Sequence, residues 1–185
     1  MDLSQFGQID RWFPDNGRLG LGPGTPQPNF SSELAEIGRE LQSANTDDFT
    51  WCILSAAWLF QDCLDESHTI SQSIHSSTGS YLHGIMHRRE GDFSNAKYWF
   101  RKAGPMDFFP ELERQIRIDN GISSETRGKL GADFSPFEMV DAVSACLLDE
   151  SAGKTNCLER ISFLELTVLT QFCIDRTEHF KKKSP

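Results

Sequence analysis

The sequence predicts an all-α fold, a single-domain bundle of about seven or eight helices preceded by an irregular arm. The length of 185 residues suits one domain. From residue 32 onward, apolar residues recur at helical spacing, and no stretch between turn residues alternates as a strand would. We therefore assign residues 1–31 to the arm and residues 32–185 to the helical domain.

The arm is rich in residues that oppose regular structure. Residues 1–31 hold four of the eight prolines and five of the fourteen glycines of the chain. Proline removes a backbone donor, and glycine loses much conformational freedom when it is ordered. The stretch NGRLGLGPGTPQP therefore predicts an irregular segment that lies over the surface of the domain.

In the first part of the helical domain, the sequence predicts two helices with apolar faces, followed by a more polar segment. The segment SSELAEIGRELQSA starts with a serine cap and has one apolar face, made of Leu34, Ile37 and Leu41. A strongly apolar helix follows from about residue 50, and residues 68–77 either extend it to residue 75 or form a short helix of their own. Gly79 then interrupts the pattern before a helix over 80–90.

Stop and start signals divide the rest of the chain. The helix predicted over SNAKYWFRKAG ends at Gly104, with Pro105 just beyond. FFPELERQIRI predicts a short helix with proline in its first turn. Residues 119–134 are polar and glycine-rich, which predicts a loop. SPFEMVDAVSACLL begins as a capping box, and the last helix is expected over 156–180.

Charge and cysteine content limit the function classes. The net charge of −9 and a pI near 5.0 argue against a broad nucleic-acid surface, which needs clustered Lys and Arg. The longest apolar run, CILSAAWLF, is too short to span a membrane. The five cysteines form no CxxC pair, and this predicts a reducing compartment, with the protein in the cytoplasm.

The stretch GIMHRREGDFSNAKYWFRKA resembles one tetratricopeptide-type helical hairpin over about residues 80–104. The small and aromatic positions of that family fall on Gly84, Gly91, Ala96, Phe100 and Ala103. The GDF sequence matches the usual turn of the family. The resemblance implies a helix pair used for packing or for binding another protein, and it implies no chemistry.

Histidines occupy the inner face of this hairpin, where the family usually carries apolar or aromatic residues. His83 and His87 lie one helical turn apart, and Glu90 extends the same face. If the preceding helix runs antiparallel to 80–90, His68 comes level with His87 and Asp65 with Glu90. Two His-plus-carboxylate pairs would then face each other inside the domain.

This cluster supports three interpretations. The first is a structural network of hydrogen-bonded imidazoles. The second is a metal-free pocket, either catalytic or for binding a small ligand or a protein partner, with the candidates Asp65, His68, His83, His87, Arg88 and Glu90 as its lining. The third is a zinc or iron site that uses His68, His83, His87 and Glu90 and leaves one position for water.

The functional prediction follows from these alternatives. We expect a binding or interaction module with a polar His/carboxylate interior. The alternative is a small metal-dependent enzyme, a hydrolase or an oxygenase, in which Arg88 or Arg89 holds an anionic substrate. The sequence identifies no substrate for either.

Overall fold

The computed structural model describes residues 11–12, 14, 17–27, 30–44, 46–149 and 152–177. These residues form nine α-helices and no strand, so the predicted all-α class is confirmed. In chain order the helices are α1 (Ser31–Ser43), α2 (Asp48–Phe60), α3 (Leu64–Ser71), α4 (Ser77–Glu90), α5 (Phe93–Ala103), α6 (Phe109–Ile118), α7 (Ser124–Leu130), α8 (Pro136–Asp149) and α9 (Ala152–Arg176).

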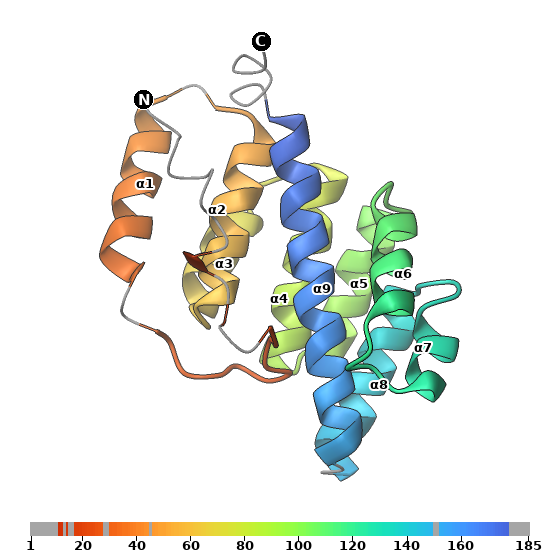
Figure 1. Cartoon of the computed structure of the whole chain (residues 1–185). Helices are drawn as coiled ribbons and strands as arrows, with labels where there is room; N and C mark the ends of the chain where they lie inside the picture. Colours follow the sequence, from red (N-terminus) through yellow and green to blue (C-terminus); the bar gives the residue numbers. More distant parts are fainter. Residues whose placement is uncertain are drawn as a thin grey trace.

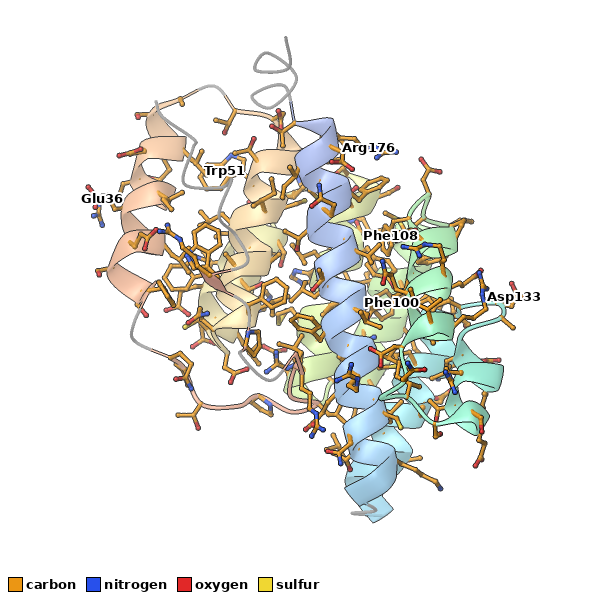
Figure 2. All side chains as sticks on the ribbon, viewed as in Figure 1. Glu36, Trp51, Phe100, Phe108, Asp133 and Arg176 are labelled. Atoms are coloured by element: carbon orange, nitrogen blue, oxygen red, sulfur yellow. The ribbon has the colours of Figure 1, made fainter. Side chains whose placement is uncertain are left out.

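The helices pack around one hydrophobic core, with α9 crossing the bundle as its longest element (Figure 1). Helices α1 to α3 lie on one side of α9 and α5 to α8 on the other, and α9 packs on α2, α6 and α8. Phe108 is buried with its ring 5.6 Å from that of Phe172 in α9, and Phe100 is buried against α4. Glu36 and Asp133 lie exposed at opposite edges (Figure 2). In the described part of the chain, no helix combines the length and the apolar character that a bilayer crossing requires.

Residues 61–63 break the apolar segment into two helices, so the expected extension to residue 75 is wrong. The amide of Cys63 donates to the carbonyl of Trp58 (3.0 Å) and that of Asp62 to Leu59 (3.2 Å). This is the Schellman pattern, with the left-handed position taken by Asp62 (φ 59°) in place of the usual glycine. Arg89 binds the Asp62 carboxylate and supports the turn. The predicted apolar helix thus ends at Phe60, and α3 is a separate element that begins before the short helix expected over 68–77.

Helix α4 begins earlier than predicted. Ser76 caps its N-terminus by accepting from the amide of Gly79 (3.4 Å), so this glycine lies inside the first turn. A Cβ atom on Gly79 would lie 2.3 Å from the Ile74 side chain, and packing thus explains the glycine. Gly84 has a similar role, because its Cβ would lie 2.7 Å from the Phe100 ring, where α4 and α5 approach closely.

A buried ion pair fastens α4 to α9. The guanidinium of Arg88 binds both carboxylate oxygens of Glu165, and the hydroxyl of Tyr81 donates to the same carboxylate (2.6 Å). Arg88 and Glu165 are at most 1% exposed. Burial, with the charge of Glu165, raises the pKa of Tyr81 well above its ordinary value, so this phenol stays a donor.

The irregular arm is held on the domain by backbone contacts. The guanidinium of Arg89 donates to the carbonyl of Gly22 (2.8 Å) and to that of Leu59 at the end of α2 (3.3 Å). The Gln61 amide donates to the carbonyl of Trp12 (2.7 Å), whose indole is buried. The predicted arm is thus confirmed as irregular where it is described, and residues 1–10 lie outside the described residues.

Helix α7 lies in the segment that was predicted to be a loop. Ser123 caps it by accepting from the amide of Thr126 (3.2 Å), and Leu130 at its end is buried. The last helix runs from Ala152 to Arg176, earlier than the expected 156–180, and residues 178–185 lie outside the described residues.

Candidate metal centre

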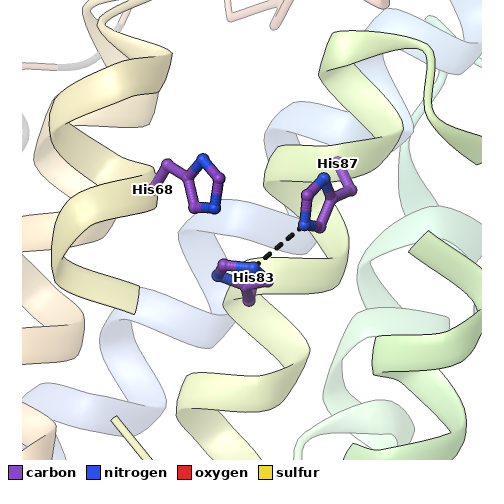
Figure 3. Close-up of side chains that lie close together, drawn as sticks. All are labelled: His68, His83 and His87. Carbon is purple, nitrogen blue, oxygen red and sulfur yellow. Dashed lines mark hydrogen bonds between the residues drawn. The ribbon is translucent and has the colours of Figure 1, made fainter. Parts of the chain in front are cut away.

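Three histidine side chains from two neighbouring helices converge at one place. Helix α3 supplies His68, and α4 supplies His83 and His87 (Figure 3). One donor nitrogen of each imidazole lies within 4.8 Å of the others. This is the one group of three or more metal-ligating side chains that converges within the described ranges, and the predicted meeting of these histidines is confirmed.

The local sequence explains the placement. His83 and His87 are four residues apart on α4, so their rings meet edge to face on one side of the helix, with centroids 4.6 Å apart. The short α3 packs on both α4 and α2 and brings His68 to 4.8 Å from the His83 ring and 5.2 Å from the His87 ring. The left-handed turn at Asp62 ends α2 and sets the start of α3, and this allows α3 to present His68 to α4.

The two histidines of α4 share a hydrogen bond between their Nε2 atoms (2.9 Å). His87 Nδ1 lies 2.9 Å from a Glu90 oxygen, and a carboxylate only accepts, so this nitrogen carries the proton. With one proton on each ring, His83 Nε2–H donates to His87 Nε2, and His83 Nδ1 accepts from the Ser71 hydroxyl (2.8 Å).

His83 is held neutral by its surroundings. Its side chain is buried, with 2% of the residue exposed. Burial first, and then the neighbouring His87, His68 and Lys102, lower the pKa of His83 to about 3. Its imidazole is therefore a neutral base at physiological pH, which is the form that binds a metal ion.

The three imidazoles would fit a tetrahedral metal ion once their nitrogens, which now lie within 4.8 Å of one another, draw closer together. Zinc with nitrogen ligands at 2.0–2.1 Å holds those nitrogens about 3.3 Å apart. The two Nε2 atoms of α4 are slightly closer than that, at 2.9 Å. To free both lone pairs, His83 must move its proton to Nδ1, where the Ser71 oxygen can accept it as readily as the hydroxyl now donates. Glu90 already fixes the matching tautomer of His87, the usual role of a carboxylate behind a metal-bound histidine.

Helix α5 forms the wall beside the α4 histidines. The ring of Trp99 lies 4.2 Å from that of His83, and the ammonium of Lys102 lies 4.3 Å above Trp99. The Asn95 amide nitrogen lies 3.1 Å from His87 Nε2. The site predicted from the sequence did not include Ser71, Asn95, Trp99 and Lys102. The last three stand at positions i, i+4 and i+7, and this spacing could have shown that they share one face of α5.

The other predicted site residues lie apart from the converging nitrogens. Glu90 lies behind His87 rather than among the ligands, with its second oxygen 3.9 Å from His68 Nδ1. Asp65 is exposed in the first turn of α3 and is not part of the group. Arg88 follows His87 by one residue, about 100° around the helix, and so points to Glu165 instead. The prediction that Arg88 lines this pocket is wrong.

The site is open on one side. The side chain of His68 is 36% exposed, and that of Glu90 is 32% exposed, whereas His87 is 7% exposed. A hollow of about 600 Å³ lies elsewhere, between α7, α8 and α9, with apolar and polar residues in its lining. That hollow contains no histidine, so it does not compete with the α3–α4 site as a metal centre.

Comparison with known proteins gives no assignment: no family model, no curated protein and no solved structure matches the chain. Function is therefore inferred from the geometry of the three histidines and their neighbours.

Proposed function

We propose that this protein binds one divalent transition-metal ion through His68, His83 and His87. The observation that carries the proposal is the convergence of three imidazole nitrogens within 4.8 Å. Two further features support it. His83 is neutral at physiological pH, and the outer nitrogens of His83 and His87 already contact a hydroxyl and a carboxylate that can orient them.

The donor set favours zinc over iron. Imidazole suits both ions, but non-haem iron sites of the common type use two histidines and one carboxylate as ligands. Glu90 is engaged behind His87, so the convergent group here is three nitrogens without an oxygen. Three histidines with a fourth position open to solvent are the ligand set of a catalytic zinc site.

The class of reaction that fits this site is metal-assisted hydrolysis. Bound zinc supplies a water whose pKa is lowered to about 7. The chain's own residues supply neutral ligands, a carboxylate that fixes the His87 ring, and an exposed side at His68 through which a substrate can enter.

Zinc titration of metal-free protein tests the proposal. Protein made without a histidine tag and stripped with chelator should take up one zinc per chain. Uptake is measured by calorimetry and by tryptophan emission, to which Trp99 contributes from its place against His83. His83→Ala and His87→Ala should abolish this uptake. His75→Ala is the matched control, because His75 is exposed between α3 and α4 and should bind zinc as the parent does.

Two results would contradict the proposal. One is the absence of zinc uptake by the parent protein. The other is equal zinc affinity of His83→Ala and His75→Ala, which would place the ion elsewhere.

A second candidate is a metal-free interaction module. It is supported by the hydrogen bonds of His83 and His87, which need no ion to complete them. It is also supported by Tyr98, 54% exposed on the α4–α5 hairpin, the segment that resembles a tetratricopeptide unit. Failure of zinc uptake, with a protein that stays folded, would favour this function over the first.

A further inference from the structure

The face of α5 beside the histidines carries hydrogen-bond donors and a positive charge. Asn95, Trp99 and Lys102 follow one another along this face at helical spacing. Each makes a contact in the direction of the site: Asn95 with His87, Trp99 with His83, and Lys102 with the Trp99 ring.

The Asn95 amide stays available as a donor beside a bound ion. Its nitrogen lies 3.1 Å from His87 Nε2 and 3.5 Å from His87 Nδ1, so it sits over the face of the ring and does not occupy the in-plane lone pair of Nε2. Metal binding through that lone pair would leave the amide next to the ion, in reach of an oxygen atom that occupies the fourth position.

The charge of the loaded site is positive. The ion and Lys102 bring three positive charges, the imidazoles are neutral ligands, and Glu90 brings one negative charge that is engaged by His87. This local excess contrasts with the formal net charge of −9 of the whole chain. A ligand that carries an oxygen anion would balance it, and the donors on α5 match such a ligand.

We propose that the ligand class of this site is a small oxygen anion, a carboxylate or a phosphoryl group, bound to the metal and held by Asn95 and Lys102. The inference rests on the proposed metal site and goes beyond it by naming what the open position takes. The organic part of the ligand would lie against Trp99, which is half-buried beside the ion.

Cobalt(II) replacement gives a direct test. The cobalt-loaded protein is titrated with acetate, with methylphosphonate and with neutral acetamide, and its visible spectrum is followed. We expect acetate or methylphosphonate to change the spectrum until the site is saturated, and neutral acetamide to leave it unchanged. The anion that saturates at the lower concentration is the preferred one. Lys102→Met should weaken anion binding by about tenfold, because it removes one charge-assisted contact.

Matched variants separate charge from other effects. Lys102→Arg keeps the charge and should retain most of the affinity. Lys97 lies on the same helix but pairs with Asp141. Lys97→Met should therefore bind anions as the parent does. Asn95→Ala should weaken binding several-fold through the lost amide donor.

The outcomes are distinguishable. Cobalt that does not bind at all would overturn both the metal site and this inference. Cobalt that binds, with a spectrum unaffected by either anion, would overturn the inference alone. The same holds if Lys102→Met and Lys97→Met bind the anion equally well.

Discussion

A change of pH from 7.5 to 5 should destabilise the metal-free protein through His83. The folded pKa of this imidazole is about 3, against 6.5 for an ordinary histidine. At pH 5 the unfolded imidazole is roughly 97% protonated and the folded one roughly 1%. The unfolded state thus binds more protons, and the free energy of unfolding falls by about 2 kcal/mol between the two pH values.

Thermal unfolding with chelator present measures this effect. For a chain of 185 residues, about 2 kcal/mol corresponds to a loss of about 4–8 °C in Tm. His83→Asn is the control, because asparagine is polar but does not titrate. His83 is neutral throughout this range, so its replacement leaves the charge around His68 and His87 unchanged. Parallel pH profiles for the parent and His83→Asn would refute the reasoning.

The remaining predictions concern stability, measured by urea unfolding. Glu165→Gln should cost about 3–5 kcal/mol, because it leaves the buried charge of Arg88 without a carboxylate, and adding Arg88→Met to Glu165→Gln should recover most of that loss while the amide oxygen still accepts from Tyr81. Gly84→Ala should cost about 1–3 kcal/mol through contact with Phe100. Gly128→Ala should gain about 0.5–1 kcal/mol, because the added methyl in α7 meets open space.

Two comparisons test the physical reasons behind these values. If the double replacement of Arg88 and Glu165 were as unstable as Glu165→Gln alone, the lost stability would come from packing rather than from an unpaired charge. If Gly84→Ala and Gly128→Ala changed stability equally, the close approach of α4 and α5 would not restrict residue 84.

The sequence predicted the helices whose ends are locally encoded. Gly104 with Pro105 and the capping box before Pro136 stand where α5 ends and α8 begins. The break after α2 was missed because its left-handed residue is Asp62, which a glycine-based signal does not detect. Its support comes from Arg89, which is distant in sequence. Helix α7 was missed because it has only seven residues, among glycines and polar side chains.

The candidate site was predicted only in part, because local spacing encodes some of it and long-range packing the rest. The spacing of His83 and His87 fixes a shared face on any helix, and it correctly indicated burial of both imidazoles. The direction of Arg88 and the position of Glu90 behind His87 depend on which helices pack around α4, and spacing does not contain that information. The resemblance to a tetratricopeptide hairpin stays a prediction.

The three histidines lie on elements of very unequal burial. In α4, twelve of the fourteen residues are buried, whereas α3 has eight residues of which three are buried. In hydrogen exchange α3 should therefore open without the rest of the bundle, and the amides of α4 should exchange last. Each such opening would detach His68 and leave two ligands on an otherwise intact helix. The residence time of a bound ion is then set by the local stability of α3, and substitutions that strengthen this short helix should slow release without altering a ligand.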